Sequence, residues 1–220
     1  MIVDQNITDY IRSLMKEENA QLDQIEQEAR ANHVPIVKPE TKELLKTLVL
    51  LQKPMKILEV GTAVGFSSLY MNNYQPEGGM IVTIERNDKR IKKARQNFHK
   101  TGKEDCITLL EGDAIEILKG IKESFDFIFV DAAKGQYIHF LDDVLRLLKP
   151  GGLLVSDNVL QDGDVAKSRY AIERRDRTIH KRMRDFLYTI KNHSRLETTI
   201  LPVGDGVAIS IKTGETNERH

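Results

Sequence analysis

Apolar residues recur along this chain with two different periods. Over the first 53 residues they return every three or four positions, as Ile7, Ile11 and Leu14 do. That spacing places apolar side chains on one face of a helix, so it predicts helices. Pro35 and Pro39 separate this pattern from a second helical one and predict a break between them.

From Lys56 onward, short apolar runs alternate with longer amphipathic stretches. The short runs predict five buried strands, at Ile57–Val60, Ile81–Ile84, Ile107–Leu110, Phe127–Val130 and Leu153–Val155. The stretches between them predict four helices, at Ser67–Asn73, Lys89–Lys100, Ile115–Lys122 and Gln136–Leu148. The alternation predicts a parallel sheet with helices on both faces, and the Pro-Gly-Gly sequence at 150–152 is expected to end the fourth helix.

The last part of the chain differs from this alternation. A long charged helix is predicted over Ile172–Asn192, and two strands follow at Thr198–Leu201 and Val207–Ile211. Between those strands lies an Asp-Gly pair, which is typical of a hairpin turn. We therefore expect an α/β fold with a mostly parallel, doubly wound sheet of about seven strands and a C-terminal antiparallel hairpin.

A single domain over residues 1–220 accounts for all of these elements. It divides into N-terminal helices (1–53), a central core (54–158), a basic loop and helix (159–195), a closing hairpin (196–213) and a tail expected to be disordered (214–220).

Composition narrows the class of protein. The 220 residues carry 33 basic and 33 acidic side chains and are 40% hydrophobic, which is enough to bury a core. One cysteine, Cys106, excludes an internal disulfide. Because we find no apolar run of membrane-spanning length and no secretory signal, we expect a cytoplasmic protein without a membrane partner. The neutral net charge argues against DNA or any extended nucleic-acid contact.

A glycine-containing turn follows the first predicted strand. Gly61 and Gly65 stand four residues apart, whereas dinucleotide-binding proteins use Gly-x-Gly-x-x-Gly, so the spacing argues against a nicotinamide enzyme. Glu59 just before the turn would suit a cationic amino group or an organising hydrogen bond. The alternative is a strand–helix turn in which glycine serves packing alone.

Acidic residues also end the second and third strands. Glu85 lies 24 residues after Gly61, where an acid can accept both hydroxyls of a ribose, unless it is a solvated strand end. Asp113, between Gly112 and Ala114, could contact an adenine or cap the next helix, and the two roles are compatible.

The ends of the fourth and fifth strands carry the sharpest signal. Asp131, Asp157 and Asn158 offer two carboxylates and one amide oxygen, a donor set that suits Mg²⁺. Lys134, three residues beyond Asp131, could act as a general base beside a metal. The alternatives are helix caps and turn residues for the triad, and a surface position for the lysine.

Taken together, these segments resemble the S-adenosylmethionine- and metal-dependent O-methyltransferases, the family of catechol and caffeoyl-CoA O-methyltransferases. The resemblance covers residues 35 to 213 and includes the ILEVGTAVGFSSL and EGDA segments. It implies a Rossmann-like class I methyltransferase fold and Mg²⁺ or Mn²⁺ on the triad, with Asp131 and Lys134 as the catalytic residues. It also implies S-adenosylmethionine contacts at Val37, Glu59, Gly61, Thr62, Ser67, Glu85, Asp113, Ala114 and Asp131.

The implied chemistry needs an acceptor with two adjacent oxygens, and both a catechol and 5-hydroxyuridine have them. Between Ala166 and Arg184 stand eight basic and two acidic residues, which predicts a local site for phosphates in an otherwise neutral chain. A solvated helix face or a subunit contact is the alternative. The candidate RNA contacts are Arg169, Arg174, Arg175, Arg177, Lys181 and Arg182.

The AIERRDRTIHKRMRDFL and LPVGDGVAISIK segments are also similar to bacterial tRNA 5-hydroxyuridine methyltransferases. That likeness implies methylation of the 5-hydroxyl at the anticodon wobble position, giving 5-methoxyuridine, with the tRNA anticodon loop as partner. Small catechols and related phenols remain the alternative substrates. The wider family also implies a homodimer, for which the N-terminal helices could provide the contact.

Overall fold

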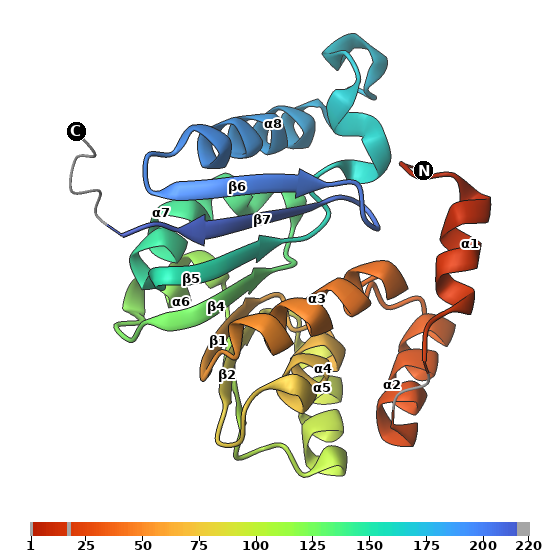
Figure 1. Ribbon diagram of the computed structural model, residues 1–220, viewed down its shortest axis with the longest axis vertical. Coiled ribbons are helices and arrows are strands. Elements are labelled where there is room, and N and C mark those ends of the chain that lie inside the picture. Colours follow the sequence, from red (N-terminus) through yellow and green to blue (C-terminus); the bar gives the residue numbers. More distant parts are fainter. Residues whose placement is uncertain (1, 17–18, 215–220) are drawn as a thin grey trace.

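The computed structural model describes residues 2–16 and 19–214. Seven strands form one sheet in the order β3-β2-β1-β4-β5-β7-β6 (Figure 1). Their bounds are β1 Lys56–Val60, β2 Met80–Glu85, β3 Ile107–Glu111, β4 Phe125–Val130, β5 Leu148–Ser156, β6 Leu196–Leu201 and β7 Val207–Lys212. The first five strands are parallel, and β7 runs antiparallel to both β5 and β6. The predicted mostly parallel sheet with a C-terminal hairpin is confirmed.

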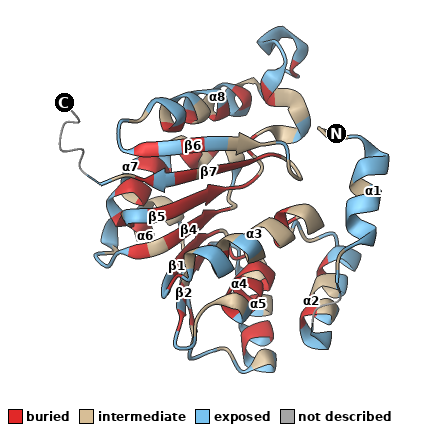
Figure 2. Cartoon of the chain, viewed as in Figure 1, coloured by how far each residue is buried: buried red, intermediate tan, exposed pale blue. Residues whose placement is uncertain are grey.

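Helices cover this sheet on both faces. They are α1 Gln5–Ser13, α2 Ala20–Ala31, α3 Pro39–Gln52, α4 Phe66–Tyr74, α5 Asp88–Thr101, α6 Ala114–Gly120, α7 Tyr137–Leu147 and α8 Arg177–Asn192. Three short 3₁₀ turns, η1 Lys134–Gln136, η2 Gln161–Ala166 and η3 Arg169–Ala171, complete the set. Side chains in the middle of the sheet are almost all buried, while α1 is mostly exposed (Figure 2).

The alternation of side chains along β4 shows how the two layers form. Ile128 and Val130 pack with α6, α7 and α8, whereas Phe127 and Phe129 pack on the opposite face, with the layer of α2 to α5. Successive strand residues point to opposite faces, so a continuous apolar run is what a doubly covered strand requires.

Polar side chains begin several of the helices. Asn19 accepts a hydrogen bond from the amide of Leu22 at the start of α2, and Asn87 caps α5 by accepting from Lys89 and Arg90. Each side chain satisfies amide groups that the helix itself leaves unpaired.

The strand order reverses between β1 and β4. From β1 the chain proceeds outward to β2 and β3, then returns to place β4 on the other side of β1. In open α/β sheets a crevice forms at this reversal, beyond the carboxyl ends of the strands. The loops after β1 and β4, which carry Gly61 and Asp131, therefore face each other there.

The predicted helix Ile172–Asn192 is wrong in its first turn, because α8 begins at Arg177. Ile172 has extended backbone angles, and its carbonyl accepts a hydrogen bond from the Arg177 guanidinium (3.1 Å). The chain before it forms η2 and η3 instead, with Gln161 and Asp162 in the left-handed region.

Two other boundaries also differ from the sequence prediction. Leu148, expected at the end of a helix, already pairs with Phe125 as the first residue of β5, and a register shift follows it. Helix α6 stops at Gly120, short of the predicted Lys122. Apart from Gly214, the tail expected to be disordered lies outside the described residues. Among the helices of residues 2–16 and 19–214, none is long and apolar enough to cross a bilayer.

Candidate active site

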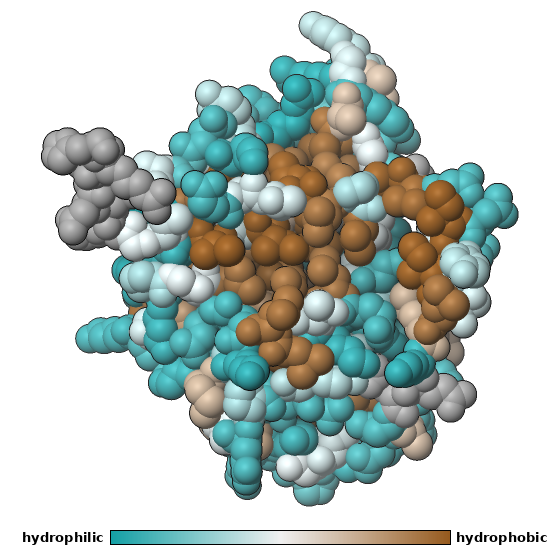
Figure 3. All heavy atoms as spheres, viewed as in Figure 1, coloured by the Kyte–Doolittle hydropathy of each residue, from teal (hydrophilic) through white to brown (hydrophobic). Residues whose placement is uncertain are grey.

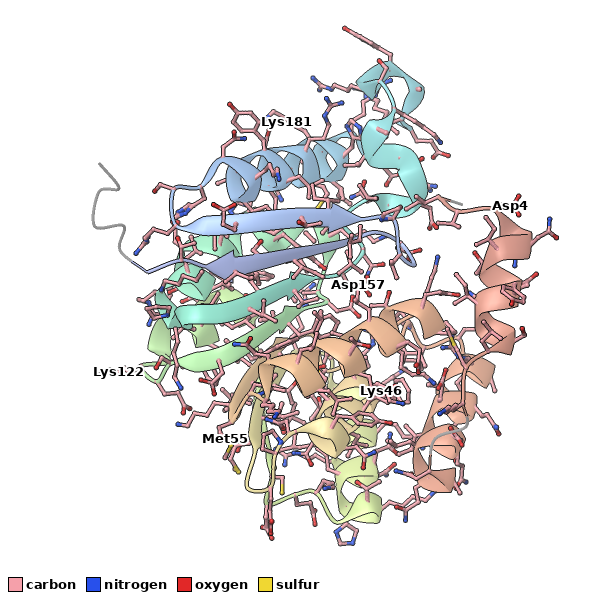
Figure 4. The ribbon with its side chains drawn as sticks, in the orientation of Figure 1. Asp4, Lys46, Met55, Lys122, Asp157 and Lys181 are labelled. Carbon is pink, nitrogen blue, oxygen red and sulfur yellow. The ribbon has the colours of Figure 1, made fainter. Side chains whose placement is uncertain are left out.

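A cavity of about 620 Å³ opens at the carboxyl ends of the strands, at the reversal of strand order. Figure 4 shows Asp157 there, between α3 and the β6–β7 hairpin. The predicted site residues that line the cavity are Gly61, Glu85, Asp113, Ala114, Asp131, Lys134, Asp157 and Asn158. The other predicted cofactor contacts, at Val37, Glu59, Thr62 and Ser67, are not among its lining residues.

Gly61 makes the close approach of two loops possible. It has φ +110°, and a Cβ atom there would lie 2.0 Å from the main-chain oxygen of Asp131. Only glycine fits this conformation and this space. The turn after β1 therefore lies directly against the main chain at the end of β4.

The carboxylate of Glu85 is held in place by three main-chain amides. It accepts hydrogen bonds from Ala63 (2.9 Å), Arg86 (2.9 Å) and Asn87 (3.0 Å). A carboxylate has about four acceptor positions, so one remains for a hydroxyl donor in the cavity. This orientation leaves room for one ribose hydroxyl rather than both, so the full ribose contact stays a prediction. The solvated strand end is contradicted because Glu85 is only 7% exposed.

Glu59 lies beneath the cavity rather than in its wall. It is completely buried and accepts hydrogen bonds from the Ser68 and Thr83 hydroxyls. Burial raises the pKa of Glu59 to about 7 against the opposing effect of the Ser67, Ser68 and Thr83 hydroxyls. The position supports the organising hydrogen bonds foreseen from sequence, since Glu59 joins β1, β2 and α4. Its Oε1 has no hydrogen-bond partner among the described residues, but the side chain does not line the cavity, so the contact with a cationic group stays a prediction.

Asp113 serves as a helix cap at the cavity wall. Its side chain accepts from the amide of Ile115 (2.9 Å) at the start of α6. Ala114 is the first residue of that helix and lines the cavity too. The helix-cap interpretation is confirmed, and the contact with an adenine stays a prediction.

Asp131, Asp157 and Asn158 lie together, as their strand ends predicted. The Asn158 amide group is 2.7 Å from Asp131 Oδ1, and the Asn158 main-chain amide donates to Asp157 Oδ1 at 2.8 Å. Burial raises the pKa of Asp131 to about 6, opposed by the Asn158 hydrogen bond. Burial and the charge of Asp131 raise the pKa of Asp157 well above its ordinary value.

These three residues fit a divalent cation. Two buried carboxylates repel each other, and a cation between them would relieve both the repulsion and the cost of burial. The oxygen and nitrogen of the Asn158 amide can exchange places by rotation, so the oxygen can face a metal ion. Residues 2–16 and 19–214 contain no group of three His, Cys, Asp or Glu side chains that could hold a metal, so Asn158 is needed to complete the set.

Lys134 belongs to η1, which follows β4 and lines the cavity. Its charge lowers the pKa of both Asp131 and Asp157, so the ammonium lies within electrostatic reach of the triad. Arg182 from α8 donates to the carbonyl of Gly135, the next residue (3.2 Å). Helix α8 therefore helps to hold the turn that presents Lys134.

Asp205 and Lys38 form a second charged group at the cavity, which sequence reasoning missed. Lys38, just before α3, pairs with Asp205 of the β6–β7 hairpin and with Asp162 of η2 (3.2 Å). Both Lys38 and Asp205 line the cavity. The Asp-Gly pair signalled the hairpin turn, and nothing in the local sequence marked Lys38.

Several basic side chains of the segment 166–184 bond to other groups of the protein, so fewer are available to phosphates than the sequence predicted. Arg182 and Arg177 donate to main-chain carbonyls of the protein, and Lys181 pairs with Asp185 (2.6 Å). Arg175 pairs with Glu173 and Asp176. The remaining predicted contacts, Arg169 and Arg174, are exposed, and between them Tyr170 is 88% exposed. Sequence reasoning missed this aromatic residue because it considered only charge.

Comparison with known proteins identifies a common family. The O-methyltransferase family profile matches residues 12–213. A catechol O-methyltransferase from Niastella koreensis is 36% identical over 133 residues, which are 59% of this chain and 60% of that protein. Caffeoyl-CoA O-methyltransferase 2 from Zea mays is 33% identical over 177 residues, 76% of this chain and 66% of that protein. The chain thus aligns with less than two thirds of the length of either relative.

Solved structures share the fold over nearly the whole chain. A crystal structure from Staphylococcus aureus has a TM-score of 0.88 at 34% identity and covers 95% of this chain and 100% of its own. The O-methyltransferase TomG from Streptomyces achromogenes, solved in complex with SAM, has a TM-score of 0.83 at 26% identity, covering 95% and 96% of the two chains.

Proposed function

Because the chain belongs to the O-methyltransferase family, we propose that it methylates the 5-hydroxyl of 5-hydroxyuridine at the wobble position of tRNA, using S-adenosylmethionine and Mg²⁺. The family and the SAM-bound neighbour support the methyl donor. The substrate and the metal rest on the residues of this chain.

The cavity residues form two groups, one for the nucleoside of the methyl donor and one for the divalent cation. Glu85 and Asp113 would bind the nucleoside, and Gly61 allows the loops after β1 and β4 to approach each other closely at the cavity. Asp131, Asp157 and Asn158 would hold the divalent cation, which lowers the pKa of an acceptor hydroxyl when bound. Holding the donor and the acceptor in one cavity contributes to the rate by removing the need for a chance encounter.

Lys134 is placed to take the proton from that hydroxyl. It stands on the cavity wall three residues beyond Asp131, and its turn is fixed from behind by Arg182. Acting as a general base in its unprotonated form, Lys134 would take the proton as the oxygen attacks the methyl group. An acceptor with two adjacent oxygens can meet both the cation and Lys134.

One observation carries the choice of RNA as substrate. The chain after Asn158 forms η2 and then η3. Arg169 and Tyr170 are exposed in η3, and Arg174 is exposed in the turn between η3 and α8. Arginines that bind phosphates and an exposed aromatic ring that stacks on an unpaired base are the means by which proteins hold RNA loops. Such a segment has no evident use for a small free phenol.

The test is methylation of tRNA that carries 5-hydroxyuridine, read as 5-methoxyuridine by mass spectrometry of its nucleosides. Arg174→Glu should weaken tRNA binding roughly tenfold, because one phosphate contact becomes a repulsion. Lys122→Glu, at the far end of the sheet from Asp157 in Figure 4, is the matched control. Equal methylation by both variants would contradict the RNA contact.

Asp131→Ala tests the metal part of the proposal. It should abolish Mg²⁺-dependent transfer to any acceptor, because half of the carboxylate pair is lost. Unchanged activity would show that the triad is not the metal site.

Small catechols are the second candidate, favoured by the likeness to the Niastella koreensis catechol O-methyltransferase. The same enzyme is assayed with a simple catechol and with tRNA. Transfer to the catechol with no change in tRNA nucleosides would establish this alternative.

A further inference from the structure

A buried tyrosine lies behind the carboxylate pair, outside the cavity wall. Tyr137 is the first residue of α7 and is only 1% exposed. Its hydroxyl is 2.9 Å from the main-chain oxygen of Asp157 and 3.2 Å from that of Val130. These two oxygens belong to the ends of neighbouring segments, since Val130 ends β4 just before Asp131 and Asp157 follows β5.

Regular pairing between the two strands ends at this point. The last paired residues are Val130 and Ser156, and the amide of Asp157 still donates to Val130 (3.0 Å). The carbonyl of Asp157 lies beyond the ladder, and a buried carbonyl needs a donor. The Tyr137 hydroxyl supplies that donor at the residue whose side chain belongs to the triad.

The ring of Tyr137 is itself fixed. It packs edge-on against Phe186 of α8, with the ring centres 5.4 Å apart and the planes at 79°. The hydroxyl is therefore directed at the strand ends by packing from α8 as well as by its own helix. A phenylalanine could keep these ring contacts and lose only the hydrogen bond.

We propose that Tyr137 is a positioning residue for the metal site, whose hydroxyl fixes the main chain of Asp157 relative to β4 and so sets the spacing of the Asp157 and Asp131 carboxylates. This inference rests on the metal part of the proposed function. Because Tyr137 does not line the cavity, it touches neither the methyl donor nor the acceptor. Outer partners of this kind tune metal affinity by holding the ligands in place.

The experiment measures Mn²⁺ binding to the full chain by electron paramagnetic resonance, in the wild type and in Tyr137→Phe. We expect the variant to bind Mn²⁺ about tenfold more weakly. Binding of S-adenosylhomocysteine without metal should be unchanged, and raising the Mg²⁺ concentration should restore transfer activity. A merely structural role would weaken the binding of S-adenosylhomocysteine as well and would not respond to the cation.

Tyr70→Phe is the matched control. Tyr70 is also buried, and its hydroxyl donates to Glu43 (3.2 Å), away from the cavity. Its loss should leave Mn²⁺ affinity unchanged.

The outcomes separate the two proposals. If the wild type binds no Mn²⁺, the metal part of the proposed function fails. If the wild type binds and Tyr137→Phe binds equally well, the positioning role is wrong while the metal site stands. If Tyr137→Phe does not fold, Phe186→Leu keeps the hydroxyl but loosens the ring, and an unchanged Mn²⁺ affinity in that variant would overturn the inference.

Discussion

Glu59 and Glu85 lie near the carboxyl ends of neighbouring strands but differ in burial and in their hydrogen-bond donors. Glu85 is surrounded by amide donors and faces the cavity, whereas Glu59 is enclosed between β1, β2 and α4 with hydroxyl donors only. Amide donors fix a charged carboxylate in place, while complete burial favours the protonated form. Sequence alone could place both acids at strand ends but could not tell how deeply each is buried.

The raised pKa of Glu59 predicts a pH-dependent stability. The unfolded chain loses this proton near pH 4.5, while the folded protein keeps it until about pH 7. The contribution of Glu59 to stability is therefore greatest below pH 4.5, falls by about 3 kcal/mol as pH rises to 7, and is constant above.

Glu59→Gln removes this titration. Urea unfolding of both proteins at pH 4.5, 6 and 8 measures the effect as a difference, so that changes from other groups cancel. The stability of the variant relative to the wild type should rise across this range. Parallel profiles would show that Glu59 titrates normally.

Arg182 shows the limit of charge patterns at the residue scale. The sequence places it in a basic run, and that run predicted an RNA contact. Its guanidinium instead donates to Gly135, which is 47 residues away along the chain. Such a contact depends on how α8 docks on η1, which no local pattern reveals.

At the scale of elements, the strands and most helices follow from apolar spacing because burial fixes them. The proximity of Asp131, Asp157 and Asn158 could likewise be predicted, because parallel strands bring their carboxyl ends to one edge. The segment between β5 and α8 could not, since its course depends on left-handed residues such as Asn158 and Asp162 and on the distant Lys38. The predicted helix Ile172–Asn192 extended into the last residues of this segment, where tertiary contacts determine a loop instead.

Lys38 should control the motion of two loops at the cavity. It joins the start of α3 to η2 through Asp162 and to the hairpin through Asp205. Lys38→Met keeps most of the side chain and removes the charge. Because Lys38 is partly exposed, we expect little change in global stability.

The expected effect is local opening. Amide hydrogen exchange, measured by mass spectrometry, should become faster in residues 159–166 and 202–206 and stay unchanged in β1 and β4. Lys46→Met, on the same helix in Figure 4, serves as the control. Equal exchange in the two variants would show that the ion pairs do not hold these loops.

At the scale of the molecule, the zero net charge conceals an uneven distribution of charge along the chain. Residues 1–30 hold seven acids and three bases, and 166–184 hold two acids and eight bases. The structure lowers the effective positive charge of the second segment. Lys167 pairs with Asp164 and Lys181 pairs with Asp185, and both acids lie just outside that range. A partner with phosphates would therefore meet a small basic area rather than a broad one.

Apolar surface supports the expected homodimer but does not select the face. Figure 3 shows it along α1 and over the strands β5 to β7. The exposed residues include Tyr10 on α1, Leu14 just after it, and Ile211 on β7 in the second area. Large exposed apolar areas are typical of protein contacts.

We predict a dimer in sedimentation equilibrium, formed through the N-terminal helices. Leu14→Glu should then give a monomer, while Ile211→Glu should not. The reverse result would assign the contact to the second area, and a monomeric wild type would contradict the prediction.

The strand order also has a consequence for folding during synthesis. β5 obtains its second neighbour only from β7, and about fifty residues of chain separate the end of β5 from that strand. During synthesis from the N-terminus, β5 therefore remains an unpaired edge strand, followed by Asp157, until β7 has been made. The sheet is complete only when the hairpin pairs with β5, so a ribosome that stalls before Val207 would leave an exposed, aggregation-prone sheet edge.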